Sequence, residues 1–148
     1  MTDTLERVQT YQQLIGGEFV DAADGRTAEV INPANDRAIA SVPASSTEDV
    51  DRAVDAAETA FQTWRQTTPQ DRSLLLLKIA DKLEEKADEL GRLESANAGK
   101  PVAAAIDEMA VCADLFRFFA GAGRVMDGLA ANEFAAGHTS IIRRDPIG

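Results

Sequence analysis

A glycine followed two residues later by a proline separates two long amphipathic runs in the second half of the chain. Residues 93–101 read Leu-Glu-Ser-Ala-Asn-Ala-Gly-Lys-Pro. Gly99 can adopt the positive φ that closes a helix, because it has no Cβ to clash with the backbone. Pro101 suits the first turn of a following helix, where its missing N–H leaves no hydrogen bond unmade. The stretch therefore predicts a sharp corner between two helices.

Two amphipathic helices are expected before this corner. Ser46 and Asp49 have the spacing of a capping box, which marks the start of the first helix. Thr68 and Pro69 mark the start of the second, and we expect a break in it near Glu85. Apolar residues recur at helical spacing on each helix and predict one stripe that faces the core. The stripes comprise Val50, Ala53, Val54, Ala57, Ala60, Phe61 and Trp64 on the first helix, and Leu76, Ile79, Ala80, Leu83, Ala87, Leu90 and Leu93 on the second.

Short strands separated by turn residues are expected before the first helix. They lie at residues 14–20, 28–32 and 38–42. Asp24 and Gly25 favour a hairpin turn between the first two strands. Pro33 ends the second strand, and Asn35 with Asp36 turns the chain into the third. The pattern indicates a small sheet that packs with the helices.

The remainder of the chain predicts a third helix and a terminal hairpin. The helical block covers residues 102–125, and the hairpin strands lie at 134–137 and 139–144, joined at Gly137-His138. The core residues expected for the helix are Met109, Leu115, Phe116, Phe119 and Met126. With strands before and after a group of antiparallel helices, the fold class is α+β.

We divide the chain of 148 residues, a length typical of one domain, into three parts. Residues 1–13 form a polar segment that is either partly ordered or a short helix on the surface. Residues 14–131 form the part made of strands and helices. Residues 132–148 form the hairpin part.

Composition excludes several classes of partner. The formal net charge is −10, from 25 acidic against 15 basic residues, whereas binding to nucleic acid requires a basic face. No run of about 18 apolar residues could span a membrane, and the N-terminal residues lack the pattern of a signal peptide. A single cysteine forms no internal disulfide. We therefore expect a cytoplasmic protein that binds neither nucleic acid nor membrane.

Five motifs together resemble the aldehyde dehydrogenase superfamily in order and spacing. They are Asn32-Pro33 before a short strand, Ala60-Phe61 with Trp64, the corner Leu-Glu-x-x-Asn-x-Gly-Lys-Pro, Arg117-Phe118-Phe119-Ala120-Gly121, and Arg143-Arg144-Asp145-Pro146-Ile147-Gly148. The resemblance implies the N-terminal portion of the α/β fold of such an enzyme. It also implies that residues 132–148 resemble an arm that joins subunits, so a homo-oligomer is expected. The motifs after Arg117 and Gly137 are similar to those of the γ-aminobutyraldehyde dehydrogenase branch.

The function that this resemblance implies is oxidation of an aldehyde, such as 4-aminobutyraldehyde, to its carboxylic acid with NAD or NADP. In the family, the nucleophilic cysteine and the dinucleotide-binding fold belong to later segments. No catalytic or cofactor-binding residue is therefore expected here, and the isolated chain is expected to be inactive. Two alternatives are an inactive fragment and an assembly module that pairs with a full-length relative.

Three features that could indicate chemistry are better explained without it. Cys112 is the only thiol, but it falls inside a predicted helix, where a packed cysteine is more common than a reactive one. His138 is the only histidine and stands at a turn, so no metal set can be built from it. Gly121 and Gly123 lack both the third glycine of a dinucleotide fingerprint and the strand before it.

The resemblance also implies a monovalent cation site. Backbone carbonyls near Val30 and Ile31 would contribute, and Asn97 stands where the family often has an aspartate. Asn97 keeps an oxygen ligand without the charge that hard cations favour. The alternative is that Asn97 simply forms a hydrogen bond at the helix end. The family usually has a glycine where Asp36 stands, so an altered turn is expected there.

Acidic residues on the third helix suggest a route for substrate. Asp107, Glu108 and Val111, with Asp114 nearby, lie on the helix that resembles the one lining the aldehyde entry tunnel of the family. A carboxylate at the tunnel mouth would attract the ammonium group of an aminoaldehyde. The alternative is an ordinary solvated acidic patch, which is common on a chain of this charge.

Overall fold

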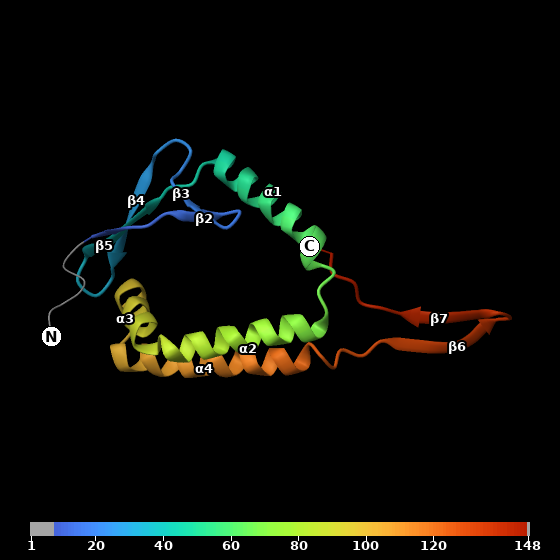
Figure 1. Ribbon diagram of the computed structural model, residues 1–148. Coiled ribbons are helices and arrows are strands. Elements are labelled where there is room, and N and C mark those ends of the chain that lie inside the picture. The colour runs from blue at the N-terminus through green and yellow to red at the C-terminus, as the bar shows by residue number, and fades with distance from the viewer. Residues whose placement is uncertain (1–7, 148) are drawn as a thin grey trace.

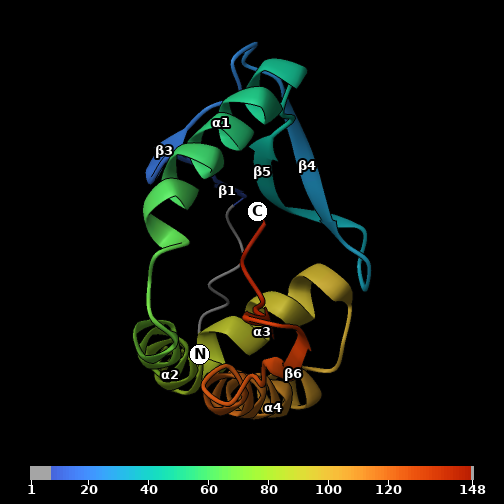
Figure 2. The same cartoon turned by 90° about the vertical axis from the view of Figure 1, so that its right-hand side faces the viewer.

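The computed structural model describes residues 8–147 and has the expected α+β class, with helices and small sheets in two layers (Figure 1). The strands are β1 (Gln9–Thr10), β2 (Gln13–Ile15), β3 (Glu18–Val20), β4 (Thr27–Asn32), β5 (Arg37–Pro43), β6 (Leu129–Ala135) and β7 (His138–Ile142). The helices are α1 (Thr47–Trp64), α2 (Pro69–Glu85), α3 (Ala87–Ala98) and α4 (Val102–Ala122). In Figure 2 the strands β3, β4 and β5 lie with α1 in the upper layer, and α2, α3 and α4 form the lower one, with β6 beside them.

The N-terminal strands pair differently from the prediction. Residues 14–20 form a tight hairpin, β2–β3, instead of one bent strand, because Gly16 and Gly17 both adopt positive φ, 62° and 88°. Since β3 pairs with β2, the turn at Asp24 and Gly25 does not join two strands of one sheet, and that prediction is wrong. β4 instead pairs antiparallel with β5.

Residues 8–13 contain strand in place of the expected surface helix or partial order. β1 pairs in parallel with β5, with Gln9 opposite Ala40 and Thr10 opposite Ser41. The side chains of β1 are exposed and bury no apolar surface. The pairing therefore depends on backbone hydrogen bonds to the open edge of β5. Residues 1–7, which belong to the same expectation, lie outside the described residues.

The turn between β4 and β5 forms at Asn35 and Asp36, as predicted. Asp36 has φ 56° and is the only residue other than glycine with positive φ in the described part of the chain. Its conformation is the one that glycine adopts without strain. Asn35 accepts a hydrogen bond from the backbone N–H of Arg37, which supports the turn.

The predicted helix starts are confirmed. Ser46 and Asp49 form a complete capping box at α1, and Thr68 forms the same arrangement with Asp71 at α2. The expected break is also present, because α2 ends at Glu85 and α3 begins after Lys86. α4 ends at Ala122, somewhat earlier than predicted, and β6 begins at Leu129, before the expected strand start.

The corner between α3 and α4 depends on Gly99, which has φ 74° and donates its N–H to the carbonyl of Ser95. Pro101 is the N-cap of α4, one position before the first helical residue. Beyond the corner, α3 and α4 approach closely, since a Cβ added to Gly91 would lie 2.6 Å from Cγ1 of Ile106. A glycine at that crossing is therefore required by packing.

Small side chains fill the interface where α2 and α4 run antiparallel, side by side (Figure 1). Ala80, Ala113 and Ala120 are all buried, and they allow the helix axes to come close. Arg117 on α4 adds a polar link, because its guanidinium group donates to Glu84 at 2.7 Å and to Asp81 at 3.0 Å on α2. This helix pair is the centre of the lower layer.

Much of the predicted core is exposed. On α1, Val50, Val54 and Trp64 keep 54%, 59% and 46% of their surface accessible. The predicted α4 core residues Leu115 and Phe119 are exposed as well, as are Leu93 and Met126. The periodicity identified the apolar stripes correctly, but nothing within residues 8–147 covers them.

The surface area leads to the same conclusion. The chain has an accessible surface of 11417 Å², whereas a compact monomer of this mass, 15.9 kDa, exposes about 7,400 Å². The difference is about 4,000 Å². Residues 1–7 and 148, which lie outside the described part of the chain, could contribute at most about 1,300 Å² of it by the scaling for unfolded chains. The fold therefore exposes much more surface than a compact monomer, and the exposed apolar stripes on α1 and α4 form part of it.

Candidate functional site

The residues expected to carry function lie on β4, on the last turn of α3 and along α4. Lys100, at the corner, forms an ion pair with Glu108 on the first turns of α4, and its Nζ lies 3.8 Å from Oε1 of Glu94 on α3. The hydrogen bond with Glu108 raises the pKa of Lys100, and the charge of Glu94 adds to this effect. The Glu108 carboxylate is thus already paired with a cation of its own chain.

Asp107 and Val111 lie together on the exposed face of α4. One helical turn separates them, and Val111 keeps 59% of its surface accessible. Among residues 8–147, Asp107 has no ion-pair partner. The structure therefore places Asp107 and Val111 side by side, while Glu108 turns toward Lys100.

The expected cation residues come from two elements that touch. α3 packs beside β4, and the register of β4 with β5 shifts between Val30 and Ile31, which leaves Ile39 of β5 without a partner in the ladder. Asn97 is exposed on the last turn of α3, and no hydrogen bond within the described residues involves its side chain. Residues 8–147 contain no group of three or more His, Cys, Asp or Glu side chains that could hold a metal ion.

Ser95, which the sequence did not single out, closes the corner instead of Asn97. Its hydroxyl donates to the carbonyl of Lys100 at 2.6 Å, and its own carbonyl accepts the N–H of Gly99. A serine on the last turn of a helix, just before a glycine, is the signal that could have identified this role.

The remaining candidates are far from any catalytic arrangement. Cys112 is partly buried in the middle of α4. His138 belongs to the hairpin, where Nδ1 lies 3.0 Å from the carbonyl oxygen of Ala136. Gly121 and Gly123 lie at the C-terminal end of α4, so they follow a helix and not the strand that a dinucleotide fingerprint requires.

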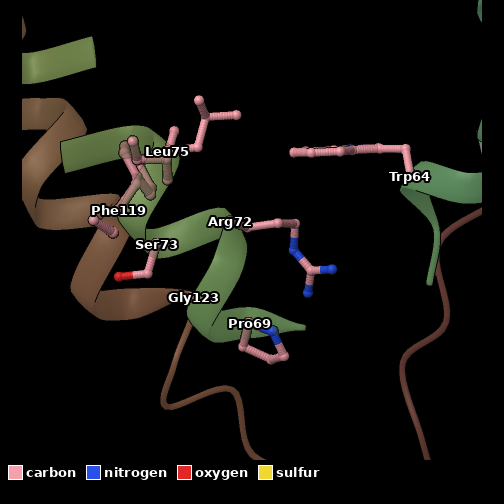
Figure 3. Close-up of a pocket in the computed structure, with 9 residues that line it drawn as sticks. Trp64, Pro69, Arg72, Ser73, Leu75, Phe119 and Gly123 are labelled. Atoms are coloured by element: carbon pink, nitrogen blue, oxygen red, sulfur yellow. The ribbon is translucent and has the colours of Figure 1, made fainter. Parts of the chain in front are cut away.

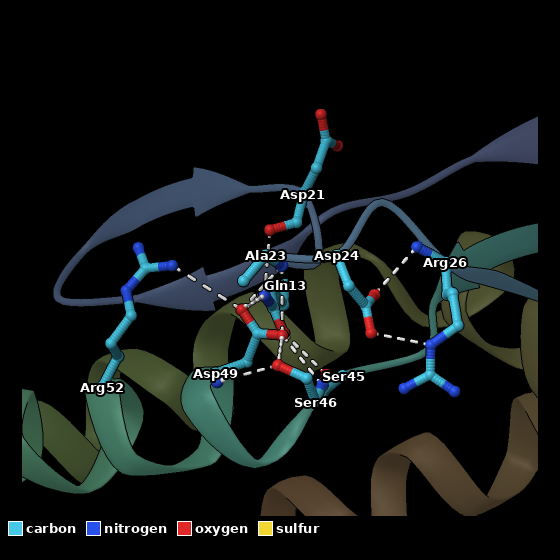
Figure 4. A network of polar contacts seen from close by, with 9 residues as sticks. All are labelled: Gln13, Asp21, Ala23, Asp24, Arg26, Ser45, Ser46, Asp49 and Arg52. Carbon is cyan, nitrogen blue, oxygen red and sulfur yellow. Dashed lines mark hydrogen bonds and ion pairs between the residues drawn. The ribbon is translucent and has the colours of Figure 1, made fainter.

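A buried carboxylate joins the N-terminal hairpin to α1 (Figure 4). Asp49 is 1% exposed, and its carboxylate accepts hydrogen bonds from Gln13 Nε2 at 2.9 Å, from the N–H of Ala23 at 3.0 Å and from the N–H of Ser46 at 2.8 Å. The Ser46 N–H is the main reason that the pKa of Asp49 falls to about 2, while burial opposes the shift. The network is fully bonded and serves structure.

An apolar groove lies where α1 gives way to α2 (Figure 3). It is lined by Trp64, Pro69, Arg72, Ser73, Leu75, Leu76, Phe119, Ala120 and Gly123. Arg72 is held at its edge by donating to the carbonyl of Thr67. With few polar groups on its walls, the groove suits an apolar side chain better than a charged ligand.

Within the described residues, none of the helices combines the length and the apolar character needed to cross a membrane.

Comparison with known proteins identifies the family. The Aldehyde dehydrogenase family matches residues 19–148. The chain is 41% identical over 122 residues to acetaldehyde dehydrogenase of Pseudomonas aeruginosa, a match that covers 82% of this chain and 24% of that protein. It is 40% identical over 136 residues to the mitochondrial aldehyde dehydrogenase of Leishmania tarentolae, covering 91% of this chain and 27% of that protein.

Solved structures share the fold. The NAD-dependent aldehyde dehydrogenase of Sinorhizobium meliloti matches with a TM-score of 0.87 and 34% identity, over 93% of this chain and 28% of that one. A variant of betaine aldehyde dehydrogenase from Staphylococcus aureus, solved with NAD+, matches with a TM-score of 0.84 and 32% identity. The match covers 88% of this chain and 27% of that one. The chain thus spans about a quarter of the length of these relatives. It belongs to the aldehyde dehydrogenase family and corresponds to the N-terminal part of such enzymes.

Proposed function

We propose that this chain forms the N-terminal part of an enzyme that oxidises an aldehyde to the carboxylic acid with NAD or NADP. The strongest support is its agreement, with a TM-score of 0.87 over 93% of its length, with an NAD-dependent aldehyde dehydrogenase. Another matched structure is described as an NADP-dependent enzyme of E. coli. The proposal therefore includes both cofactors.

The described residues do not build a site for the cofactor. A dinucleotide requires a glycine-rich turn between a strand and a helix, and the glycines of this chain at 121 and 123 end a helix instead. Cys112 has no histidine beside it. No step of hydride transfer or nucleophilic attack is therefore assigned to this chain, which contributes the helices and the corner on which further protein packs.

For the substrate, we propose an aminoaldehyde such as 4-aminobutyraldehyde. The proposal is supported by the motifs that begin at Arg117 and Gly137, and by the acidic residues on the exposed face of α4. Because Glu108 is paired with Lys100, the carboxylate available to an ammonium group is that of Asp107, which lies beside Val111. An exposed charge of this kind attracts the substrate before it binds.

A chimera tests the enzyme proposal. This chain would replace the matching quarter of the S. meliloti enzyme, and aldehyde-dependent NADH formation would be followed together with far-UV circular dichroism. We expect the chimera to oxidise aldehydes with NAD, while this chain alone, as purified protein, forms no NADH. A folded chimera without activity would contradict the proposal, and so would aldehyde oxidation by the isolated chain that disappears in Cys112→Ser.

The alternative function is an assembly module that pairs with a full-length relative. It is supported by the β6–β7 hairpin, which projects from the two layers in Figure 1 and whose β7 side chains are all exposed. The division at residue 132 into a body and a hairpin part belongs to this proposal, and so does assembly into a homo-oligomer. A pull-down with a full-length relative, with and without residues 129–142, tests it.

A monovalent cation beside Val30, Ile31 and Asn97 is a further part of the proposal. Its support is that α3 packs against β4, whose register with β5 shifts between Val30 and Ile31. Thermal melts of the chimera in potassium, sodium and choline chloride at equal ionic strength would test it. A melting temperature that is the same in all three salts would contradict the cation site.

A further inference from the structure

We propose that the turn at Asp24-Gly25 is a site of spontaneous aspartate isomerisation in the unfolded chain, and that Arg26 protects it in the folded protein. The chain contains two aspartate-glycine pairs, Asp24-Gly25 and Asp127-Gly128. An aspartate before a glycine is prone to this reaction, because glycine has no side chain to hinder ring closure. The fold holds the two pairs differently. The proposal does not depend on the proposed enzymatic function.

The isomerisation needs no enzyme and no co-reactant except water. The backbone nitrogen of Gly25 attacks Cγ of Asp24, and the proton of this nitrogen leaves with the carboxyl hydroxyl as one water molecule. The product is a five-membered succinimide ring, which water then opens at either carbonyl. Breakage of the new bond between nitrogen and Cγ returns aspartate. Breakage of the original peptide bond leaves isoaspartate, in which the main chain runs through Cγ.

This chemistry sets three conditions on the turn. The carboxyl group must be protonated, since an ionised carboxylate has no hydroxyl group to release. The backbone nitrogen must give up its proton. The nitrogen and Cγ must also approach each other in the geometry of attack, so the side chain and the following peptide group must be free to turn.

The carboxylate of Asp24 is held in the unreactive form (Figure 4). Its Oδ1 accepts the N–H of Arg26 at 3.0 Å, and its Oδ2 accepts Nε of the same residue at 2.7 Å. The Arg26 N–H, and then its guanidinium group, lower the pKa of Asp24, because both bonds favour the ionised carboxylate. Held at both oxygens, the side chain cannot rotate freely toward the nitrogen of Gly25.

The nitrogen of Gly25 is held as well. Its N–H donates to the carbonyl of Ala22 at 2.9 Å and closes the turn, and the glycine adopts φ 72°. A hydrogen bond from the N–H favours the protonated nitrogen over the deprotonated one. The same bond fixes the plane of the peptide group that would have to turn during the attack.

The rest of the fold anchors this turn on both sides. Before it, the N–H of Ala23 donates at 3.0 Å to the carboxylate of Asp49, which is 1% exposed. After it, the carbonyl of Arg26 accepts the N–H of Ala44 at 2.9 Å. An exposed ion pair is weak by itself, but here the backbone of Arg26 is already fixed and only its side chain must be ordered. The protection comes from contacts within the chain and is independent of what covers this face.

The second pair lies in a different setting. Asp127 and Gly128 connect the end of α4 to the start of β6. Within the described residues, the carboxylate of Asp127 makes neither a hydrogen bond nor an ion pair. Asp127 therefore provides an internal reference for an unprotected aspartate-glycine pair in the same molecule.

Ageing of the purified chain tests the proposal. Wild type, Arg26→Gln, Arg26→Lys and the control Arg37→Gln are incubated at neutral pH, both folded and unfolded in guanidinium chloride. Arg37 is a matched control, because its N–H also donates to the side chain two residues earlier, that of Asn35. Isoaspartate at positions 24 and 127 is quantified by peptide mass spectrometry with electron-transfer fragmentation. Circular dichroism establishes which samples are folded.

We expect isoaspartate to form severalfold more slowly at position 24 than at position 127 in the folded wild type and in the folded control. In guanidinium chloride the two positions should react at similar rates, because the protection is lost with the fold. Folded Arg26→Gln should accelerate the reaction at position 24 severalfold and leave position 127 unchanged. Arg26→Lys, which keeps the charge but loses the bond from Nε, should lie between wild type and Arg26→Gln.

Two comparisons can each overturn the proposal. The first needs no variant, and it fails if Asp24 in the folded wild type reacts as fast as Asp127 or as fast as in the unfolded chain. The second compares folded Arg26→Gln and Arg26→Lys with the wild type. Unchanged rates at position 24 in these variants would show that Arg26 does not protect the turn.

Discussion

Gly99 and Pro33 touch across the corner of the molecule, where a Cβ on Gly99 would stand 2.8 Å from Cγ of Pro33. The contact brings the end of α3 against the end of β4. It also explains why two motifs far apart in the sequence, Asn32-Pro33 and the glycine of the corner, occur together. The ring of Pro33 leaves no room for a side chain at position 99. The first prediction follows from this contact.

Gly99→Ala should destabilise the chain by about 2–3 kcal/mol. A left-handed conformation costs an L-residue about 1–2 kcal/mol, and the new methyl group must also displace Pro33. Urea unfolding followed by circular dichroism measures the loss. Gly121→Ala is the matched control, because it lies in α4 with nothing within 4 Å of the new Cβ. The control should be neutral or slightly stabilising, and equal losses in both variants would contradict the argument.

Gly91→Ala should cost about 1–3 kcal/mol through overpacking. Its Cβ would meet Ile106 at 2.6 Å from Cγ1 and 2.7 Å from Cα, and a backbone atom cannot be moved without separating α3 from α4. Replacing Ile106 with alanine in the same chain should restore only part of the loss, because the clash with Cα remains. Full restoration would show that the side chain alone sets the limit.

Asp49→Asn should destabilise the link between the β2–β3 hairpin and α1, and the loss should depend on pH. The pKa of Asp49 is lowered from 3.8 to about 2 in the folded chain. A lowered pKa means that the ionised carboxylate stabilises the fold above the unfolded value, and that this contribution disappears as the pH falls from about 4 to about 2. The difference in stability between wild type and variant should therefore shrink over that interval.

Asp71→Asn supplies the comparison for this prediction. Asp71 forms the same capping box at α2, but it is exposed and has no partner from another element among the described residues. Its replacement should cost less than that of Asp49. Thermal melts at several pH values decide, and a constant difference between wild type and Asp49→Asn down to the acid end would contradict the role of the ionised carboxylate.

In an enzyme that contains this chain, Asp107→Asn should raise KM for an aminoaldehyde more than for an uncharged aldehyde. The effect should shrink as salt is added, because an exposed charge mainly steers the ligand. Glu108→Gln should have the smaller effect, since Lys100 already neutralises that carboxylate. Equal changes for both aldehydes at low salt would remove the proposed role of α4 in substrate attraction.

The β6–β7 hairpin should exchange its amide hydrogens faster than β4–β5 in the monomer. It is a two-stranded ribbon with every β7 side chain exposed, and such a ribbon is marginally stable in isolation. Hydrogen exchange followed by mass spectrometry compares the two hairpins within one sample. Slow exchange across Ser140 and Ile142 in a species shown to be monomeric would contradict this expectation.

Local signals in the sequence were sufficient for the helices but not for all of the strands or for their partners. The capping box at Ser46, the helix start at Thr68, the break near Glu85 and the turn at Asp36 each depend on neighbouring residues, and all were predicted. The pairing of β3 with β2 was missed, because Asp24-Gly25 marks a turn without saying which strands it joins. The parallel pairing of β1 with β5 could not be predicted, because a strand of two polar residues shows no apolar alternation.

The prediction of the candidate site had the same limit: positions on an element could be predicted, but contacts between elements could not. Asp107, Glu108 and Val111 were placed correctly on one helix, but the pairing of Glu108 with Lys100 depends on how the corner folds back. Asp49 was recognised as a cap, while its bond to Gln13, which is remote in sequence, could not be inferred. The periodicity of α1 indicated an apolar stripe but could not show what would cover it.

The main contact between the strand layer and the three lower helices is the one between α3 and β4. Two units unfold in a single cooperative transition only when the loss of their shared interface makes partial unfolding unfavourable. An interface this small provides little coupling. The layers should therefore melt as separate units in the isolated chain, and a mutation in the Asp49 network should shift one transition while leaving that of α2 and α4 in place.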